Sequence, residues 1–414
     1  MNILLINHYA GSKVHGMEYR PFYLAREWVK LGHKVTIIAA SFSHLRNQSP
    51  NISGEISQEI IEGVRYKWLK TPTYQGNGVG RIINMLMFIL LLFKNKTCLI
   101  KEFKPDMVIA SSTYPLDIFP AYRIAKNSGV KLIFEVHDLW PLTPIELGGM
   151  SPYHPFIIVM QWAENFAYRV ADRVVSMLPK ADSYMLEHGM ASNKFVYIPN
   201  GIAVEEWENH NTPLPEQHRV VLDEIKKNGR FILGYAGGFG LSNALDYLVD
   251  AAFLLMNQPI TVVMVGQGPE KERLQKKIME KGIRNVVFLP LVSKTAIPSL
   301  LASMDILYIG WNKQPLYRFG ICPNKLLDYM MAAKPVIHAV AAGNDLVTES
   351  GCGISVPPEN PVAIADVVVN FIRMEQEERA RMGSLGKKHV LANFNYRTLA
   401  NRFLEILENL PNKA

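Results

Sequence analysis

The segment 317–337 contains the richest group of side chains that could bind a phosphate. Pro323 suits the first position of a helix, and the amides that follow it would then lack intrahelical partners. These amides belong to Asn324, Lys325 and Leu326. Because a helix N-terminus of this kind attracts anions, the segment predicts a phosphate site.

Charged side chains around this helix start would extend the site to a whole nucleotide. Lys325 and Arg318 would add positive charge for a phosphate. Asp328, about one turn into the helix, could accept hydrogen bonds from a ribose diol. An ordinary capped helix with a solvated lysine would contain the same residue types, so both interpretations stay open at this level.

A second group of candidate residues follows an apolar run in the N-terminal half. His137 and Asp138 come directly after the run 131–136, and Asp138 would either orient the imidazole or cap the loop. A single histidine after a strand is more often structural than functional. Glu146 is a candidate substrate-binding carboxylate, although an exposed loop glutamate is the more common interpretation.

The loop after the first apolar run is flanked by two glycines, Gly11 and Gly16. We expect a helix to start at Gly16, with amides that approach a substrate phosphate and with Glu18 or Arg20 at a second substrate. The chain has no G-x-G-x-x-G, so a nicotinamide cofactor is not supported.

Length and composition limit the class of protein. The 414 residues predict two domains of ordinary size, and 49% hydrophobic residues exclude a disordered or fibrous chain. Three scattered cysteines form neither a disulfide framework nor a metal-ligand spacing, which predicts a reducing compartment and no metal site. A net charge of +7 favours an anionic partner.

One apolar run, 82–93, raises the question of a membrane. As a helix it would span about 18 Å against about 30 Å of hydrocarbon, so we expect it not to cross a bilayer. Arg81 and several lysines flank the run, which would suit contact with an anionic membrane surface. A helix packed on a sheet explains the run equally well. The first residues do not resemble a signal peptide, so we expect a cytoplasmic protein.

Short apolar runs alternate with helical patterns along the whole chain, which predicts α/β folding around parallel sheets. Runs at 3–6, 35–40, 107–110, 131–136, 173–176 and 195–198 form a first series, and 231–237, 260–266, 286–289, 306–311, 335–340 and 353–356 form a second. We expect two Rossmann-like, doubly wound domains, 1–203 and 204–390, that face a deep cleft, and a C-terminal helix within 391–414 that packs back toward the first domain. The polar segment 204–230 reads as the connection between them.

Several fragments, in this order and spacing, resemble the retaining glycosyltransferases of family four, which have the GT-B architecture. They are GHKVT at 32–36, PNG at 199–201, YAGG at 235–238, VGQGPE at 265–270, NVVFL at 285–289 and LLDYMMAAKPVI at 326–337. The resemblance implies that Asp328 binds the ribose, that Leu291 and Val292 lie where the base binds, and that His137 faces the donor sugar as a catalytic residue. It places the nucleotide sugar on the second domain and the acceptor on the first, where Glu146 and either Glu18 or Arg20 are the expected acceptor-side residues.

The chain departs from the family pattern where the diphosphate should be held. The first glutamate of the family's E-x-F-G motif is missing, and the usual loop arginine and lysine are replaced by Gly238 and Asn243. We expect phosphate binding to have moved to the helix start at 323–326, with Gly237 and Gly238 still lining the site and with Lys325 and Arg318 as catalytic cations. The chain has no Asp-x-Asp, so we expect no metal and no cofactor.

The resemblance implies a metal-independent transfer of a sugar from UDP with retention of configuration. The Pro-Asn-Lys pattern and the opening at 7–21 are similar to a subgroup that includes N-acetylfucosamine transferases of bacterial surface polysaccharides. An N-acetylated hexosamine or deoxyhexosamine and a lipid-linked or growing glycan of O-antigen or capsule are therefore expected, with peripheral contact at the inner membrane and no nucleic acid. A nucleotide-sugar 2-epimerase and a non-catalytic glycan-binding protein remain alternatives.

Overall fold

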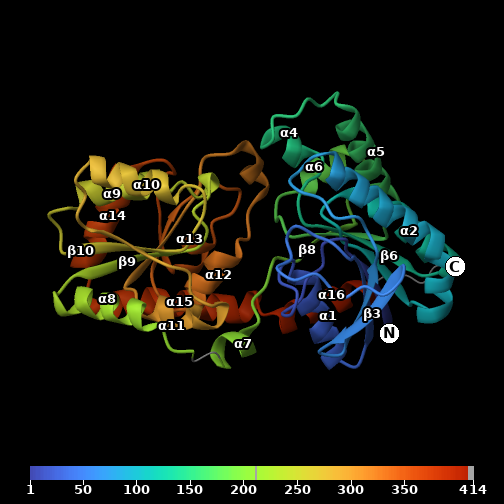
Figure 1. Cartoon of the computed structure of the whole chain (residues 1–414), viewed down its shortest axis with the longest axis horizontal. Coiled ribbons are helices and arrows are strands. Elements are labelled where there is room, and N and C mark those ends of the chain that lie inside the picture. The colour runs from blue at the N-terminus through green and yellow to red at the C-terminus, as the bar shows by residue number, and fades with distance from the viewer. Residues whose placement is uncertain (210–211, 409–414) are drawn as a thin grey trace. The chain divides into compact units, whose positions relative to one another are not determined.

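The computed structural model describes residues 1–209 and 212–408, so the end of the predicted C-terminal helix, 409–414, lies outside the described residues. The chain divides into two compact units. The first contains Met1–Asn200 and the chain from Tyr396 onward, and the second contains Gly201–Asn395. Figure 1 shows the elements of both units.

The first unit is built on an eight-stranded sheet with the order β3-β4-β2-β1-β5-β6-β7-β8. Every pairing is parallel except that of β3 with β4. The strands are β1 (Asn2–Ile6), β2 (Lys34–Ala40), β3 (Ile56–Ile61), β4 (Val64–Leu69), β5 (Met107–Ala110), β6 (Lys131–Val136), β7 (Arg173–Ser176) and β8 (Phe195–Tyr197).

The order of the strands reverses between β1 and β5, where Ile6 is in register with Ala110. Ligands of open α/β sheets bind outside the carboxyl ends of the strands at such a switch point. Asn7, Ser111 and His137 directly follow β1, β5 and β6, so their side chains reach the same sheet edge. The alternation of strands and helices therefore positions the first candidate site.

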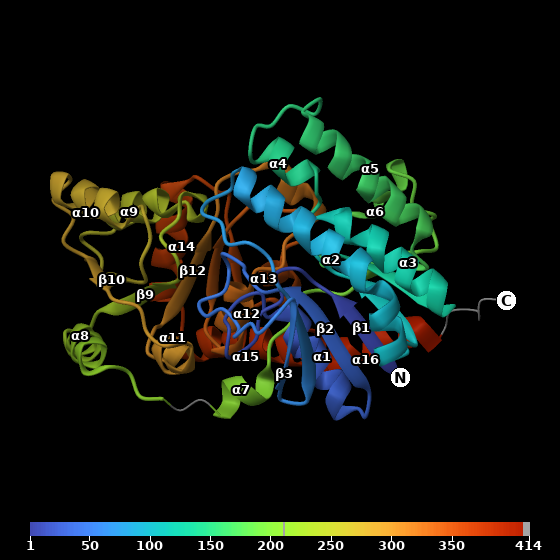
Figure 2. The same ribbon diagram turned by 45° about the vertical axis from the view of Figure 1, so that its right-hand side comes forward.

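Helices cover both faces of this sheet (Figure 2). They are α1 (Arg20–Lys30), α2 (Val79–Phe103), α3 (Ile118–Ser128), α4 (Leu142–Glu146), α5 (Pro155–Val170), α6 (Asp182–Glu187) and α16 (Tyr396–Glu408), with the 3₁₀ turn η1 (Pro115–Asp117). Helix α16 packs on α1, where Trp28 Nε1 donates to the carbonyl of Ala400 at 3.1 Å and its ring meets Phe403. Helices α2, α3 and α5 cover the opposite face.

Helix α2 is longer than the apolar run 82–93 predicted, because it continues from Val79 to Phe103. By length and composition alone it could span a membrane. Within the protein, 39% of its most apolar 18-residue window is buried. One face packs on the unit, with Phe88 and Leu92 fully buried. Leu86 and Leu90 on the other face are exposed, so the helix is apolar on both its buried and its exposed side.

The hairpin of β3 and β4 was not expected from the sequence. Val64, Tyr66 and Trp68 are buried while Arg65 and Lys67 are only partly covered, which is the alternation of a strand with one core face. The turn at Glu62 and Gly63 has positive φ at both residues, as a tight hairpin requires.

The second unit contains a six-stranded parallel sheet with the order β11-β10-β9-β12-β13-β14, which reverses between β9 and β12. Its strands fall where the apolar runs predicted them. They are β9 (Phe231–Ala236), β10 (Ile260–Val265), β11 (Val286–Leu289), β12 (Ile306–Gly310), β13 (Val336–Ala339) and β14 (Gly353–Ser355).

Two apolar layers enclose this sheet. The helices are α7 (Val204–Asn209), α8 (Glu216–Lys227), α9 (Leu245–Leu254), α10 (Lys271–Glu280), α11 (Ile297–Ala302), α12 (Asn324–Met331), α13 (Leu346–Ser350), α14 (Pro361–Arg373) and α15 (Gln376–Asn393), with 3₁₀ turns η2 (Leu241–Asn243), η3 (Lys294–Ala296) and η4 (Pro315–Phe319). The segment 204–230 is more than the connection we expected, because Leu222 and Ile225 of α8 belong to the core.

Candidate active site

A cavity of about 240 Å³ lies in the second unit at the carboxyl ends of β9 and β10. It brings together five of the residues that the sequence singled out: Gly237, Leu291, Val292, Lys325 and Asp328. Tyr329, Ile297 and Leu301 supply further walls. Lys325, Asp328 and Tyr329 share one face of α12, since residues three and four apart are neighbours on a helix.

The Lys325 ammonium is held over the loop that follows β9. Its Nζ donates to Tyr235 Oη at 2.8 Å and to Asn243 Oδ1 at 3.1 Å. The Gly238 carbonyl accepts in turn from Tyr235 Oη at 2.6 Å and from Asn243 Nδ2 at 3.1 Å. This closed ring of hydrogen bonds places a cation from α12 beside the loop in which the family's own cations are missing.

Gly237 allows the lysine to approach this closely. A Cβ at this position would lie 2.7 Å from both Cε and Nζ of Lys325, and the φ of +155° is one that residues with side chains rarely adopt. The glycine therefore makes the contact possible, which matches its expected place in the site.

Burial changes the charge balance in this cavity. It lowers the pKa of Lys325 to about 7, because the ammonium loses solvent. It also raises the pKa of the Asp328 carboxyl to about 7, which Lys294 opposes. Removal of charge from water is the cause in both cases, and titratable groups perturbed in this way within a cavity are typical of ligand sites.

The start of α12 differs in detail from our expectation. Pro323 is the cap, not the first helical residue, and Asn324 begins the helix with an exposed side chain. The Leu326 amide already donates to the Pro323 carbonyl at 3.0 Å, and its side chain is buried in the core. Leu326 therefore supplies no donor to a phosphate, and only the amides of Asn324 and Lys325 remain as candidates.

Two further expected residues do not line the cavity. Arg318 lies on η4 with an exposed side chain, where it donates to the Pro315 carbonyl at 2.8 Å and covers the Phe319 ring. Gly238 contributes the carbonyl that anchors Tyr235 and Asn243. The structure thus brings Lys325 and Asp328 together and leaves Arg318 outside.

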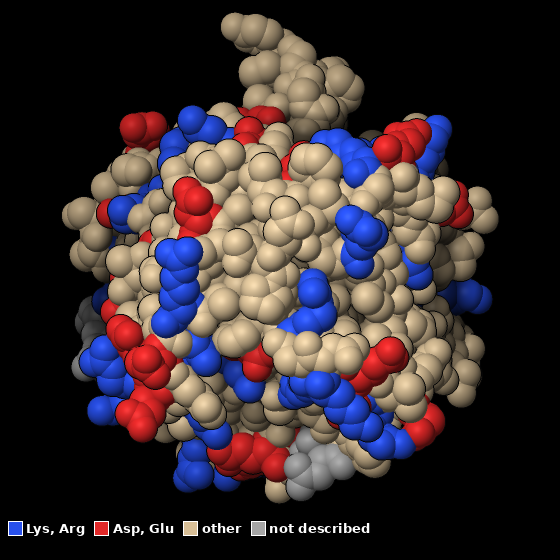
Figure 3. Space-filling model, turned by 90° about the vertical axis from the view of Figure 1, so that its left-hand side faces the viewer, with Lys and Arg blue, Asp and Glu red and all other residues tan. Residues whose placement is uncertain are grey.

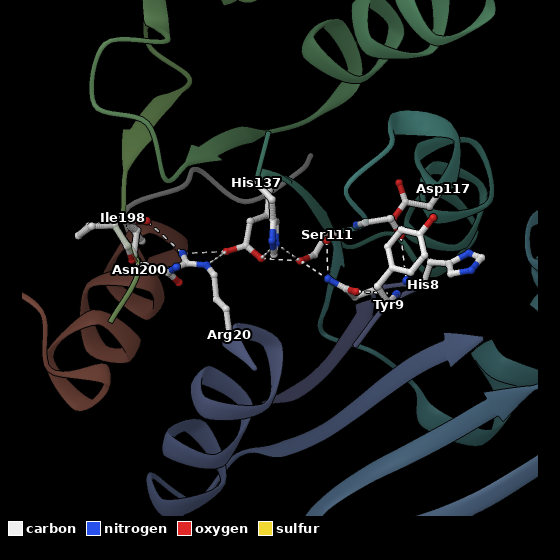
Figure 4. Close-up of polar contacts among 12 residues, drawn as sticks. His8, Tyr9, Arg20, Ser111, Asp117, His137, Ile198 and Asn200 are labelled. Carbon is white, nitrogen blue, oxygen red and sulfur yellow. Dashed lines mark hydrogen bonds and ion pairs between the residues drawn. The ribbon is translucent and has the colours of Figure 1, made fainter. Parts of the chain in front are cut away.

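A second polar cluster lies at the switch point of the first unit (Figure 4). His137 Nε2 is 3.0 Å from Ser111 Oγ and 3.4 Å from Glu135 Oε2. Ser111 Oγ donates to Glu135 Oε2 at 2.6 Å and accepts from Asn7 Nδ2 at 3.2 Å. The Ser111 hydroxyl uses its only hydrogen in the hydrogen bond to Glu135, so it must accept a hydrogen bond from the imidazole. Nε2 of His137 therefore carries a proton, and these contacts fix the orientation of the ring.

Arg20 does not have the acceptor-side role that we expected. Its guanidinium is fully buried, and its Nε and Nη2 donate to Glu135 Oε1 at 3.1 Å and 3.0 Å. The carbonyls of Ile198 and Pro199 accept its remaining hydrogen bonds. A side chain enclosed in this way cannot reach a substrate, and Arg20 instead neutralises the carboxylate that holds His137.

The pKa values in this cluster follow from the pairing. Burial alone would raise the pKa of Glu135, but Arg20, His137 and Ser111 outweigh it and lower the value to about 2. For His137, burial acts in the opposite direction and by itself would lower the pKa. The hydrogen bond to Glu135 and the negative charges of Glu135 and Glu18 outweigh burial and raise the pKa of His137. The cluster therefore favours an imidazolium in front of an ionised carboxylate.

The first loop is folded on itself and is not the start of a helix. Gly16 pairs with Ser12 through two backbone hydrogen bonds, and α1 begins only at Arg20. A Cβ at Gly11 would lie 1.9 Å from the Gly16 carbonyl oxygen, so this loop requires a glycine there. Partial burial raises the pKa of Glu18, which His137 opposes.

The other two expected residues lie on the segment that follows β6. Asp138 has an exposed side chain, and the contacts that orient the His137 ring come from Ser111 and Glu135. Glu146 is the last residue of α4 and is half-buried. Among the residues that the structure describes, no group of three or more His, Cys, Asp or Glu side chains gathers as a metal ion would require.

Sequence reasoning missed the partners that hold both clusters. Glu135 is an acidic residue inside an apolar strand, and a charge in that position is expected to be paired, which is a signal that could have been used. Tyr235 and Asn243 gave no such signal, because their role depends on Lys325, which lies 90 and 82 residues away.

Comparison with known proteins agrees with this geometry. Residues 15–201 match the family described as glycosyl transferase 4-like domain, and residues 230–374 match glycosyl transferases group 1. The two matches lie in different units and together span most of the chain. The chain belongs to the family-four glycosyltransferases.

Among relatives of this glycosyltransferase is the putative colanic acid biosynthesis glycosyl transferase WcaI of Escherichia coli, 24% identical over 387 residues, or 89% of this chain and 92% of the relative. The probable glycosyltransferase WbjE of Pseudomonas aeruginosa is 23% identical over 387 residues, or 90% of each chain. The crystal structure of HepE from Anabaena in complex with UDP has a TM-score of 0.68 at 16% identity, covering 99% of this chain and all of the other. This likeness shows the GT-B fold.

Proposed function

We propose that this glycosyltransferase transfers a sugar from a UDP-sugar to a glycan acceptor with retention of configuration and without a metal ion. The observation that carries the proposal is the placement of Lys325 and Asp328 on one face of α12 within the cavity at the β9 switch point. A cation and a carboxylate three residues apart match the two polar ends of a nucleoside diphosphate, its phosphates and its ribose diol.

The diphosphate in this proposal is held by Lys325 and by the amides of Asn324 and Lys325. These groups stabilise the negative charge that develops on the leaving phosphate, because the helix start and a fixed cation are already oriented toward it. Leu291 and Val292 line the same cavity and offer apolar surface to the base. HepE, which shares the fold, was crystallised in complex with UDP, which supports the choice of nucleotide.

The reaction breaks the bond between the anomeric carbon and the phosphate oxygen. A hydroxyl oxygen of the acceptor then forms the new bond on the same face of the sugar, and its proton passes to the departing phosphate oxygen. The leaving group takes the proton itself, so no dedicated base is needed. Charge balance is kept because UDP leaves as the protonated product.

We assign His137 to the stabilisation and positioning of the donor sugar, as the resemblance implies. Glu135 and Ser111 fix Nε2 within the protein, so Nδ1 is the ring nitrogen left to donate a hydrogen bond outward. The raised pKa of His137 keeps that donor protonated. We keep Glu18 and Glu146 as proposed acceptor-side groups and Asp138 as a proposed substrate-binding residue.

The relatives support a substrate class from polysaccharide assembly. WcaI is named for colanic acid biosynthesis, which is a surface polysaccharide. The resemblance to the surface-polysaccharide subgroup leads us to propose an N-acetylated hexosamine or deoxyhexosamine as the donor sugar and a lipid-linked intermediate of surface polysaccharide assembly as the acceptor. The reaction would then take place at the cytoplasmic face of the inner membrane.

The test is the release of UDP from UDP-N-acetylhexosamines, with and without a polyprenyl-diphosphate-linked sugar, in the presence of a chelator. We expect UDP only when both substrates are present, and a product whose anomeric configuration, read by NMR coupling constants, equals that of the donor. Conversion of the donor to its 2-epimer without acceptor would instead establish the epimerase. Glycan binding without any UDP-sugar turnover would establish a binding protein.

A further inference from the structure

The exposed side of α2 carries an apolar stripe that no described residue of the unit covers. Ile83, Leu86, Met87 and Leu90 are all exposed, and Leu90 has 61% of its surface accessible. Their spacing of three and four residues places them on one face of the helix. A soluble protein rarely leaves such a continuous apolar stripe in water unless something binds it.

Helix α5 repeats this pattern in the same helical layer. Ile158, Val159 and Trp162 are exposed, with 57% of Trp162 accessible. The half-buried Phe119 of α3, which lies between α2 and α5, stacks on the Trp162 ring with centroids 4.7 Å apart. Figures 1 and 2 both show α2, α3 and α5 on one side of the sheet. We call the exposed faces of these three helices the α2–α5 surface.

The same three helices carry most of the net positive charge of the protein. Their sequences contain seven basic residues and two acidic ones, so they account for +5 of the total net charge of +7. One of the acids, Glu164, is buried, and the other, Glu102, is ion-paired with Lys67 at 2.8 Å. Lys94 is paired with Glu55, but Arg123 and Lys126 are exposed on α3 between the two stripes.

The rest of the chain does not share this bias, because its 37 basic and 35 acidic residues leave a net charge of only +2. In Figure 3, basic and acidic side chains are interspersed over the face that is drawn. In the second unit, Arg273, Lys277 and Lys281 are ion-paired with Asp246 and Asp250. Positive charge without matching acids is therefore concentrated where the apolar stripes are.

The α2–α5 surface adjoins the sheet edge that holds His137. Arg81, at the start of α2, donates from Nε to Tyr9 Oη at 3.1 Å, and Tyr9 follows β1. The Arg81 guanidinium also covers the Trp140 ring. That ring contacts Phe156 of α5 edge-on, with the ring centroids 6.1 Å apart. The N-terminal ends of both helices thus reach the edge on which an acceptor sugar would bind.

We propose that the α2–α5 surface binds the protein to an anionic lipid bilayer, with α2 lying along the interface. Apolar side chains then enter the acyl boundary, and the nearby lysines and arginines are attracted to the anionic lipid headgroups. The buried face of α2 keeps it in the fold and out of the hydrocarbon. The inference rests on the proposed function only in that the bilayer would carry the lipid-linked acceptor.

The test is flotation of the purified protein with vesicles of phosphatidylcholine alone or with 30 mol% phosphatidylglycerol, without any sugar substrate. We expect binding to the anionic vesicles, weaker binding to the neutral ones, and loss of binding as NaCl is raised. The double variant Leu86→Asp/Leu90→Asp should reduce the bound fraction by more than about tenfold, because it removes apolar contact and adds repulsion.

The matched control is Met279→Asp on α10, where the side chain is 77% exposed but lies outside the α2–α5 surface. It should bind vesicles as the wild type does. Absence of wild-type binding, or equal loss in both variants, would overturn the proposal. The proposal would also be overturned if the wild type sediments as a dimer and the Leu86→Asp/Leu90→Asp variant as a monomer. The α2–α5 surface would then join two copies of the protein. UDP affinity is measured on the same samples, so failure of the nucleotide site is seen separately.

Discussion

Arg20 and Glu135 form an ion pair in which both side chains are completely buried, with Arg20 Nη2 3.0 Å from Glu135 Oε1. The pair joins the start of α1 to β6, and its other carboxylate oxygen accepts from Ser111 and lies near His137. A buried charge without its partner is expensive, so each member depends on the other.

Arg20→Met should therefore destabilise the first unit strongly. The change leaves the Glu135 carboxylate buried without its cation, and we expect a loss of about 3–5 kcal/mol in the free energy of unfolding. Urea unfolding followed by tryptophan fluorescence measures this. The double variant Arg20→Met/Glu135→Gln should recover much of the loss, and a double variant as unstable as Arg20→Met would contradict the account.

Glu135→Gln alone should destabilise the first unit, because the Arg20 guanidinium is then buried without its counterion, and it should also change the titration of His137. Without the carboxylate, burial dominates and the pKa of His137 should fall below its wild-type value, as seen in the NMR titration of its ring protons. Since we assign the imidazolium to the donor sugar, kcat should fall at pH 7 and recover partly at lower pH. An unchanged His137 titration would show that Glu135 has only a structural role.

Gly237→Ala should weaken UDP binding although the alanine adds no charge. Its Cβ would collide with Lys325 Cε and Nζ, so the ammonium must leave its place between Tyr235 and Asn243. We expect a loss of roughly tenfold in affinity, equal to about 1.4 kcal/mol, by calorimetry. Gly282→Ala, in the same unit, is the control, because a Cβ there meets nothing within 4 Å and only the backbone conformation is strained.

The affinity for UDP should fall as the pH rises from 7 to 9. The pKa of Lys325 is lowered to about 7 by burial, so above that pH the free protein holds a neutral amine. A diphosphate binds the charged form, and binding at pH 8 should therefore take up a proton, which calorimetry in buffers of different ionisation enthalpy measures. Lys325→Met should bind weakly without that uptake, and an equal proton uptake in this variant would assign it to another group.

The sequence predicted the parts of the fold that depend on local pattern. The buried runs of β1, β9 and β10 were evident as short apolar segments, and Asp328 and Lys325 could be placed on one helix face by their spacing. The hairpin of β3 and β4 was missed although Glu62 and Gly63 mark its turn.

Contacts between distant residues could not be predicted. Arg20 meets Glu135 across 115 positions, and no local pattern distinguishes this arginine from one at a substrate. The capture of Lys325 has the same character. The sequence indicated Lys325 as a replacement for the cations missing after β9, but it did not indicate that Tyr235 and Asn243 would hold the ammonium. Local periodicity thus placed the site's elements, and tertiary packing decided which side chains reach it.

The most direct test of the proposed donor site is calorimetry with EDTA, using UDP, 2′-deoxy-UDP, GDP and ADP on the wild type and on Asp328→Ala. We predict that the wild type prefers UDP to GDP and ADP, and that it binds UDP roughly tenfold more tightly than 2′-deoxy-UDP, since a hydrogen bond to a carboxylate contributes about 1.5 kcal/mol or more. Asp328→Ala should bind UDP and 2′-deoxy-UDP equally. A folded wild type that binds none of the four nucleotides, or an Asp328→Ala variant that keeps the ribose preference, would contradict the assignment.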